Sequence, residues 1–432
     1  MLDPKALTKI QSIILIAIVV VAAVGGAVYY LLAPGNEQSA DTIKIGLCVD
    51  IGTFMGDKLR QGALLAAEQV NAEGGVLGRE FEIVVEDDDI ASADMQFASS
   101  ALTRLMTADE ADLILSIAGP VFSSLYQEKA AEFQKILFNY GDSSDALTQK
   151  VLDDYDKYNY FFRFGLNNSI ITETLVDSFI ACREYTGFNK VAILAHDLGI
   201  GELVYSSYVA GLEDYNFDVV YTSLTPYSTI DFSSFFAQAE AAGAEIFYPM
   251  VIGQAATIPF IKEYYDRQSP MIIWGSYGIW SNFWELTEGK CDSITAAGHA
   301  LTVGYPMSSK VIPTREAYFE RWGEEIEICA AFGYDVVRFI LPEAIEQAGT
   351  IETEAVIAAL ENMEIETSLA KKIAFTPSHD PMVITTGDDY WVHCLFQWQN
   401  GERVPIYPKS IKEAAGASYT FPDWPGPWDN ID

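Results

Sequence analysis

Serine and glycine residues follow an apolar run in the first third of the sequence, where they could bind a small polar molecule. The run Asp112–Ala118 reads as a buried strand, and it is followed by Gly119-Pro-Val-Phe-Ser-Ser-Leu-Tyr-Gln127. Ser124 and Gln127 have the spacing of a capping box, which predicts a helix beginning near Ser123 or Ser124. A helix N-terminus carries unpaired N–H donors and a partial positive charge, so this stretch is a candidate anchor for a carboxylate. The alternative is that Ser124 only caps its helix.

A second polar stretch, Gly141-Asp-Ser-Ser-Asp145, follows the next predicted strand. The carboxyl ends of parallel strands meet at one edge of a sheet, so we expect this stretch beside Gly119–Gln127. An enzyme could use Asp142, Asp145 or His196 as an acid or base, but the chain has no nucleophile elbow, phosphate loop or metal-binding constellation. We therefore expect a binding site that performs no chemistry.

The composition indicates a globular, acidic protein. Its 432 residues are enough for two domains with a sizeable core, and half of them are hydrophobic. The 61 acidic residues outnumber the 26 basic ones, which gives a net charge of −35. Such a charge repels polyanions and argues against nucleic acid as a partner.

The five cysteines are widely scattered, and no CxxC or Cys/His spacing suggests zinc. We therefore expect neither a metal nor a cofactor. Cys48 and Cys394 lie in strand-like runs and are expected as buried thiols, whereas a disulfide among the other three stays open.

The N-terminal residues read as a single-pass membrane anchor. Ser12–Ala33 contains no charged residue and is long enough to cross a bilayer, which takes about 20 residues. Lys5 and Lys9 precede it, so the positive-inside rule places residues 1–11 in the cytoplasm and the rest of the chain outside the cell. Residues 34–42 would then be a polar tether. The alternative is a cleaved secretory signal, although its apolar region is usually only about 7–15 residues.

Beyond the tether, apolar runs alternate with helical patterns in two successive sets. Strands that alternate with helices predict parallel α/β sheets, and two sets predict two doubly wound, Rossmann-like lobes with ligand-facing loops at the strand carboxyl ends. Strands of the first set are predicted at 43–51, 80–85, 112–118 and 136–140. Those of the second set are predicted at 190–195, 218–224, 245–250 and 271–274.

The last third of the sequence has too few elements for a third core. A strand is predicted at His299–Tyr305, with helices at 314–322, 333–348 and 352–362 and short strands near 373–376, 391–398 and 404–407. We expect them to complete two lobes joined by a multi-strand hinge, one lobe formed by 43–163 plus 299–375 and the other by 164–298 plus 380–410. Residues 411–432 are rich in proline and tryptophan, and they either pack across a lobe as a strap or stay loose.

Four motifs occur along the chain in a characteristic order: Asn71-Ala-Glu-Gly-Gly-Val-Leu-Gly-Arg79, Gly119-Pro-Val-Phe-Ser-Ser124, Gly333-Tyr-Asp-Val-Val337 and Phe396-Gln-Trp-Gln-Asn-Gly401. In this order and spacing the chain resembles, over Ile43–Pro408, the substrate-binding proteins of ABC transporters for branched-chain amino acids (Leu/Ile/Val). That family has the type I periplasmic binding protein fold, in which two lobes close on a ligand. The resemblance implies a solute-binding protein and not an enzyme.

The resemblance also implies ligand contacts in the first lobe. Family members hold the ligand's carboxylate at the start of the helix after the third strand, which here falls on Val121, Phe122 and above all Ser123. The ammonium group and further carboxylate contacts would come from the loop after the next strand, at Asp142, Ser143 and Ser144. Asp142 replaces the small residue usual there and could serve as the counter-ion of an ammonium group. The alternative is that it caps the following helix.

The second lobe departs from the family pattern. Ile200 stands where members often carry a tyrosine, and Tyr277 where an acidic residue contacts the ammonium group in the type member. Tyr277 is expected to face the cleft, whereas the tryptophans that follow it are expected to be structural. The family closes the apolar side of the pocket with a loop that here carries Phe54 and Met55.

These expectations describe a membrane-anchored extracellular solute-binding protein. It would capture an amino acid or amide-like molecule by lobe closure and deliver it to ABC permease and ATPase subunits. Two alternatives stay open: a ligand-sensing ectodomain with a separate signalling partner, and a surface assembly whose N-terminal helices pack through Gly25-Gly26. The changed ammonium contacts leave the identity of the ligand open.

Overall fold

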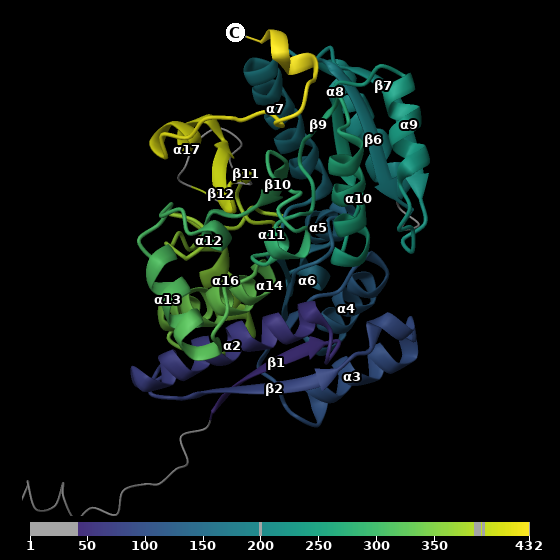
Figure 1. Cartoon of the computed structure of the whole chain (residues 1–432). Coiled ribbons are helices and arrows are strands. Elements are labelled where there is room, and N and C mark those ends of the chain that lie inside the picture. Colours follow the sequence, from purple (N-terminus) through teal and green to yellow (C-terminus); the bar gives the residue numbers. More distant parts are fainter. Residues whose placement is uncertain (1–41, 198–200, 384–389, 391–393, 432) are drawn as a thin grey trace, which may run out of the picture. The chain divides into compact units, whose positions relative to one another are not determined.

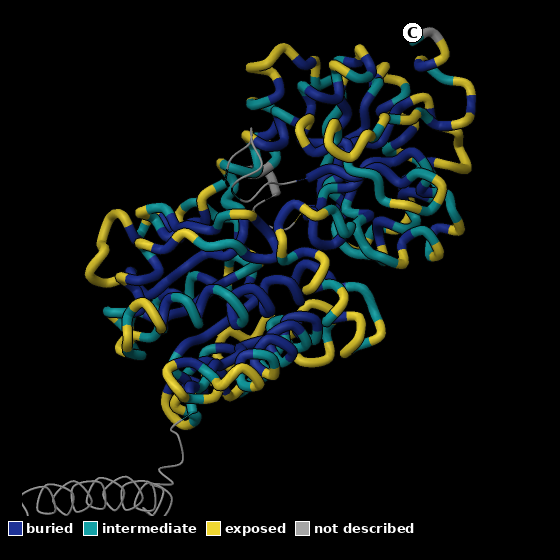
Figure 2. The backbone as a smooth tube through the Cα atoms, turned by 90° about the vertical axis from the view of Figure 1, so that its left-hand side faces the viewer, coloured by how far each residue is buried: buried dark blue, intermediate teal, exposed yellow. Residues whose placement is uncertain are grey.

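The computed structural model describes residues 42–197, 201–383, 390 and 394–431, and residues 43–432 form one compact unit (Figure 1). Buried residues in this unit gather in two large apolar cores (Figure 2). Each core surrounds one parallel sheet. We call the part built on the N-terminal sheet the first lobe and the part built on the other sheet the second lobe.

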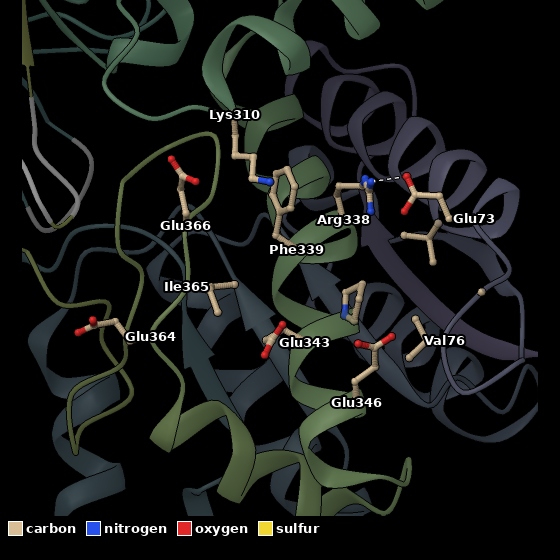
Figure 3. Close-up of a pocket in the computed structure, with 13 residues that line it drawn as sticks. Glu73, Val76, Lys310, Arg338, Phe339, Glu343, Glu346, Glu364, Ile365 and Glu366 are labelled. Carbon is tan, nitrogen blue, oxygen red and sulfur yellow. Dashed lines mark hydrogen bonds and ion pairs between the residues drawn. The ribbon is translucent and has the colours of Figure 1, made fainter.

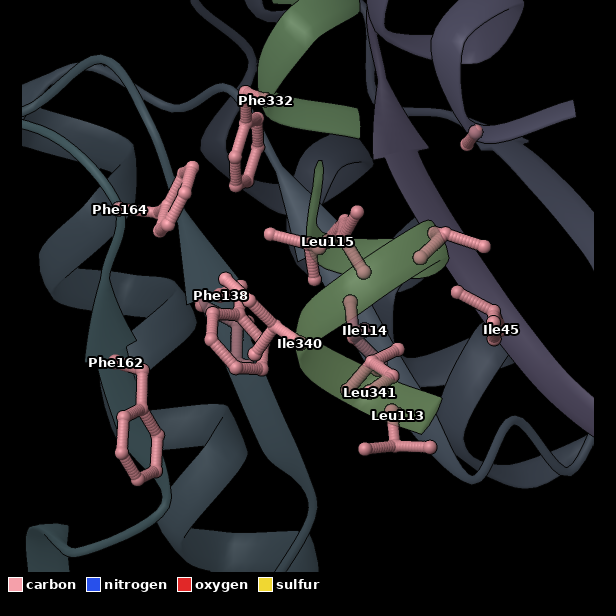
Figure 4. Close-up of a cluster of buried hydrophobic side chains, with 14 of the residues drawn as sticks. Ile45, Leu113, Ile114, Leu115, Phe138, Phe162, Phe164, Phe332, Ile340 and Leu341 are labelled. Atoms are coloured by element: carbon pink, nitrogen blue, oxygen red, sulfur yellow. The ribbon is translucent and has the colours of Figure 1, made fainter. Parts of the chain in front are cut away.

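The first lobe contains a five-stranded parallel sheet in the order β2-β1-β3-β4-β5. Its strands are β1 (Ile43–Val49), β2 (Phe81–Asp87), β3 (Leu113–Ser116), β4 (Ile136–Asn139) and β5 (Phe161–Arg163). Leu115 of β3 aligns with Leu47 on one side and with Phe138 on the other. The central strands are continuous apolar runs because a parallel sheet is covered on both faces. Figure 4 shows their side chains packed with Ile340 and Leu341 from the C-terminal third of the chain.

The helices of the first lobe come from two separate parts of the sequence. The first part supplies α2 (Phe54–Ala72), η1 (Ile90–Ser92), α3 (Met95–Thr107), α4 (Pro120–Phe133), α5 (Asp145–Asp153) and α6 (Tyr155–Tyr158). The second part supplies α12 (Ala300–Val303), α13 (Val311–Trp322), α14 (Ile328–Asp335), the π-helical η2 (Val336–Ile340), α15 (Leu341–Ala348) and α16 (Thr353–Asn362). Helices α2 and α14 touch through glycine, because a Cβ at Gly62 would lie 1.9 Å from the Ala330 carbonyl oxygen.

The second lobe contains a four-stranded parallel sheet in the order β7-β6-β8-β9. Its strands are β6 (Lys190–His196), β7 (Asp218–Thr225), β8 (Ile246–Met250) and β9 (Ile272–Ile273), and its helices are α7 (Asn168–Thr186), α8 (Gly201–Asp214), α9 (Ser233–Ala241), α10 (Gln254–Arg267) and α11 (Phe283–Leu286). Aromatic rings fill the core, with Phe236 and Phe260 4.7 Å apart between ring centres. The buried Trp274 donates from Nε1 to the Ser178 hydroxyl at 3.2 Å.

A three-stranded antiparallel sheet of β10 (Thr295–Gly298), β11 (Cys394–Gln399) and β12 (Glu402–Tyr407) completes the strands that the structure describes. Along the described residues the chain passes between the two cores three times: from β5 to α7, from β10 to α12, and from Phe375 to β11. The predicted strand at His299–Tyr305 is wrong, because β10 ends at Gly298 and the next residues form α12. A short apolar run suits either element, and Gly304 at φ +75° supplies a helix C-cap here.

The C-terminal residues pack across the second lobe as a strap, flanked by α17 (Lys409–Ala414) and including η3 (Pro427–Asn430). Trp424 donates from Nε1 to the Ser269 carbonyl at 3.0 Å, and its ring lies 5.3 Å from that of Tyr264. Gln397 of β11 donates to the Thr420 carbonyl at 2.6 Å and accepts from its N–H at 2.8 Å.

In the part of the chain that the structure describes, no helix combines the length and the apolar character that a bilayer crossing requires. The predicted cytoplasmic segment 1–11, the predicted anchor 12–33 and all but the last residue of the predicted tether lie outside the described residues.

Candidate functional site

Ser123 and Asp142 lie together beyond the carboxyl ends of β3 and β4. The Ser123 hydroxyl donates a hydrogen bond to one Asp142 carboxylate oxygen, and the Ser144 N–H donates to the other at 2.7 Å. Both side chains are buried, with 0 % and 4 % of their surface exposed. In this conformation Asp142 fixes the turn that precedes α5, which is close to the capping alternative. Direct contact of these groups with a ligand stays a prediction.

The helix after β3 begins earlier than predicted. Helix α4 starts at Pro120, which suits the first helical position because its missing N–H would be unpaired there in any case. Gly119 is the N-cap residue, so the prediction of a capping box at Ser124 and Gln127 is wrong. Gln127 is buried, and its Nε2 donates to the Leu147 carbonyl at 2.7 Å.

Two tyrosines that the sequence pattern did not single out, Tyr140 and Tyr208, have pKa values to which Tyr277 contributes. Burial raises the pKa of Tyr140, which follows β4, and Cys329 and Tyr277 add to the effect. Burial also raises the pKa of Tyr208 on α8, with contributions from Tyr277 and Asp145. Tyr277 thus influences the pKa of one tyrosine in each lobe. The position of Tyr140 at a strand end could have singled it out.

The other residues predicted to contact the ligand differ in how far they are exposed. Phe54 and Met55 form the first turn of α2 and not a loop, because the Thr53 hydroxyl caps the helix by accepting from the Gly56 N–H at 3.2 Å. Phe54, Met55 and Val121 are exposed. Phe122, Ser143 and Ser144 are partly buried, and Ile200 lies outside the described residues.

Sequence reasoning also missed Arg163, the last residue of β5, which is fully buried. Its guanidinium donates to the carbonyls of Asp142 and Ser144, both at 2.5 Å. The signal that could have found it is a single charge at the end of the aromatic strand Phe161-Phe162-Arg163. A buried charge needs partners, and here these are polar groups of the candidate loop.

Carboxylates also gather at the ends of β1 and β2, where Asp88 is fully buried. The Tyr126 hydroxyl donates to Asp88 at 2.8 Å, and the Cys48 thiol lies 3.7 Å from that hydroxyl. Burial raises the pKa of Asp88 to about 6 against the lowering effect of the Tyr126 hydrogen bond. Within the described ranges, no group of three or more His, Cys, Asp or Glu side chains is arranged to hold a metal ion.

An open cavity of about 570 Å³ lies at the C-terminal end of α2 (Figure 3). Arg338 forms an ion pair with Glu73 at 2.6 Å on its rim, and the Lys310 ammonium lies 5.5 Å from the centre of the Phe339 ring. Helix α2 has 19 residues and is therefore about 28 Å long. The cavity is thus remote from Phe54 and from the strand ends that carry the candidate site.

Comparison with known proteins supplies the family. Residues 42–391 match the family described as periplasmic binding protein. The Leu/Ile/Val-binding protein homolog 7 of Brucella abortus is 23% identical over 396 residues, which cover 87% of this chain and 94% of that protein.

Solved structures share the fold at low identity. The branched-chain amino acid transporter substrate-binding protein of Streptococcus pneumoniae, in complex with isoleucine, has a TM-score of 0.67 and 18% identity, covering 84% of this chain and 99% of that one. An ABC transporter solute-binding protein from R. palustris, in complex with benzoate, has a TM-score of 0.68 and 16% identity, covering 84% and 95%. The expected α/β fold of type I periplasmic binding proteins is confirmed. The chain belongs to the periplasmic binding protein family, whose members bind solutes and are not enzymes.

Proposed function

We propose that the protein is the solute-binding component of an ABC importer and delivers a small amphipathic molecule, such as an amino acid or an amide, to a permease. The observations that carry the proposal are the buried polar pair Ser123 and Asp142 at the carboxyl ends of β3 and β4, and the hydrogen bonds that join Ser281 of the second lobe to Glu327 of the first. A site shared by two lobes that are joined by three crossings is suited to ligand-driven closure. Membership of the periplasmic binding protein family supports this function.

The candidate site favours a ligand that joins a carboxylate or carbonyl to an apolar body. The N-terminus of α4 supplies the positive end of a helix dipole for the acceptor end, and the exposed Phe54, Met55 and Val121 supply apolar surface. Isoleucine and benzoate, which are bound by two relatives of the same fold, both have this form. An ammonium group would need Asp142, whose carboxylate is here occupied by Ser123 and the Ser144 N–H.

We further propose that residues 12–33 anchor the protein in the cell membrane with the binding lobes outside. The uncharged, apolar character of this segment supports a single crossing, with residues 1–11 inside and 34–42 as tether. Expression of the full chain and of residues 42–432 tests this. The full chain should sediment with membranes, and the shorter chain should stay in the supernatant. Recovery of the full chain in the supernatant at its complete mass would contradict an anchor.

Isothermal titration of residues 42–432 against the twenty amino acids, their amides and simple aromatic carboxylates tests the transport function. We expect at least one compound to bind with a dissociation constant near 1 μM or below, which corresponds to about −8 kcal/mol. Ser123→Ala and Asp142→Asn should each lower its affinity, whereas Ser100→Ala, at an exposed serine of α3, should not. Absence of binding across the panel would count against the function. Unchanged affinity in both site variants would show that Ser123 and Asp142 only stabilise the helix and the turn in which they lie.

A further inference from the structure

Arg163 contacts the candidate ligand loop, residues 142–145, from the interior of the first lobe. Its Nη1 donates to the Asp142 carbonyl and its Nη2 to the Ser144 carbonyl, both at 2.5 Å, and Nη2 also lies 3.3 Å from the Thr148 hydroxyl. A guanidinium is planar and always charged, so its fork holds the two carbonyls at a set separation. Lysine could satisfy only one of them at a time with the same geometry. One buried side chain thus binds two backbone carbonyls of the loop.

Asp380 is the counter-ion of this arginine. Its carboxylate lies 2.8 Å from Arg163 Nε, with both side chains almost fully buried. The other carboxylate oxygen accepts from Asn167 Nδ2 at 3.2 Å and from the Ser378 hydroxyl at 3.0 Å. Asn167 in turn caps α7, where the second lobe begins. Arg163 and Asp380 therefore stand where two of the crossings leave the first lobe.

The loop is also bonded directly to the start of α7. The Asn168 N–H donates to the Ser143 carbonyl at 2.6 Å, and the Ser169 N–H donates to the Asp145 carboxylate at 3.2 Å. The residues expected to contact the ligand are thus tied to the crossing on one side and to Arg163 on the other. A change in the direction of the crossing must strain these bonds or move the loop.

We propose that Arg163, together with Asp380, is a positioning residue that sets the conformation of loop 142–145 and couples it to the first crossing between the lobes. The proposal rests on the proposed function, because it takes this loop as a ligand contact. A buried ion pair by itself adds little net stability compared with apolar residues of similar volume. The donors to the loop carbonyls are the part that apolar residues cannot replace.

Hydrogen exchange measured by mass spectrometry separates positioning from simple charge balance without a ligand. The reporters are the amides of Ser144 and Asn168, and the reference is the Leu137 amide, which donates to the Tyr160 carbonyl at 2.8 Å in the same sheet. The double variant R163M/D380L removes both charges and leaves no unpaired one. We expect exchange at Ser144 and Asn168 to rise at least tenfold in this variant, with the Leu137 rate unchanged.

Three further variants complete the test. R163K keeps the charge but loses the fork, so it should also speed exchange at Ser144. D380N should have a smaller effect because both donors of Arg163 to the loop carbonyls stay in place. R315K is the matched control, since Arg315 also donates to two carbonyls, those of Leu301 and Thr302, and pairs with Glu325 away from the loop. It should leave both reporters unchanged.

Two results would overturn the proposal. Wild-type exchange at Ser144 and Asn168 in the double variant would show that Arg163 only balances Asp380. Faster exchange at Leu137 in R163K and in the double variant alike would show a general role in folding. With any compound that binds the wild type in the titration panel, R163K should lose at least tenfold in affinity while R315K does not. If no compound of the panel binds the wild type, the proposed function is contradicted. The hydrogen-exchange result alone then decides whether Arg163 positions the loop.

Discussion

The carboxylate of Glu327 in the first lobe accepts two hydrogen bonds from Ser281 in the second lobe, one from its N–H and one from its hydroxyl, both at 3.2 Å. Glu327 is 6 % exposed, and burial raises its pKa while Ser281, Arg403 and Lys58 oppose the shift. This contact exists only when the lobes lie close to each other. Its strength therefore bears on the balance between open and closed forms.

Ser281→Ala should shift this balance towards the open form. The variant removes one of the two hydrogen bonds to a buried carboxylate, and a bond to a charged group contributes about 1.5–3 kcal/mol. We expect about a tenfold shift, visible as a larger radius of gyration in X-ray scattering of residues 42–432. Ser234→Ala, at an exposed serine of α9, is the control. A radius equal to that of the wild type in both variants would show that the contact does not influence closure.

Lowering the pH from 7 towards 4 should stabilise the protein through Asp88. Burial raises the pKa of this carboxyl from 3.8 to about 6, so the folded protein takes up the proton at a higher pH than the unfolded chain does. The stabilising contribution is therefore complete below about pH 4 and is lost as the pH rises through 6. A shift of about two pKa units corresponds to at most about 3 kcal/mol. Asp335, with a pKa also raised to about 6 by burial, acts in the same direction.

Asp88→Asn isolates this contribution, because the amide still accepts from the Tyr126 hydroxyl but does not titrate. Its free energy of unfolding, from urea titrations at pH 7 and pH 4.5, should change less with pH than that of the wild type. The exposed Asp94→Asn, which keeps the N-cap of α3, should follow the wild type. Identical pH dependence in Asp88→Asn and the wild type would be inconsistent with a raised pKa.

Gly62→Ala should destabilise the first lobe by about 2–4 kcal/mol. The new Cβ would lie 1.9 Å from the Ala330 carbonyl oxygen, and a backbone atom can yield only if α2 and α14 separate. Urea unfolding followed by circular dichroism measures the loss. Gly119→Ala, whose Cβ would meet no atom within 4 Å, should cost only about 1 kcal/mol as a changed helix cap. Equal midpoints for Gly62→Ala and Gly119→Ala would refute the close contact.

Trp424→Ala should loosen the strap and destabilise the second lobe by about 3–5 kcal/mol. The side chain is buried, its ring lies 5.3 Å from that of Tyr264 and 5.5 Å from that of Tyr265, and it donates to the Ser269 carbonyl. The midpoint of thermal unfolding measures the loss of stability, and the rate of proteolytic cleavage C-terminal to residue 416 measures the loosening of the strap. Tyr227→Ala, at a tyrosine that is 57% exposed, is the control. Resistance to proteolysis equal to that of the wild type would mean that the strap does not depend on this ring.

The two-lobed architecture could be predicted because the central parallel strands are short apolar runs between turn residues. Leu113–Ser116 and Lys190–His196 are examples, and burial on both faces requires such runs. Helix ends were harder to place. Helix α4 begins at Pro120, because proline is favoured at the first helical position. Gly119 is therefore the N-cap residue, and Ser124 lies inside the helix. The strand prediction for His299–Tyr305 was wrong because an apolar run of that length fits either a strand or a short helix.

The candidate site could be predicted only in part. Position at the end of a strand identified Ser123 and the loop after β4, but no local pattern encodes their mutual hydrogen bond. Arg163 and Asp380 are 217 positions apart in the chain, so their pairing follows from the tertiary fold alone. The hydrogen bonds between Ser281 and Glu327 likewise depend on how the two lobes meet. Ligand contacts at these positions remain predictions.

All five cysteines of the chain are buried thiols. Burial raises the pKa of each of them, to about 12 for Cys291, Cys329 and Cys394, so very little reactive thiolate exists at neutral pH. New cysteines at exposed positions, such as Leu152 in the first lobe and Tyr215 in the second, would therefore react with maleimide dyes far faster than the native ones. A donor and acceptor dye on this pair would turn the unaltered remainder of the protein into a fluorescent sensor for its own ligand.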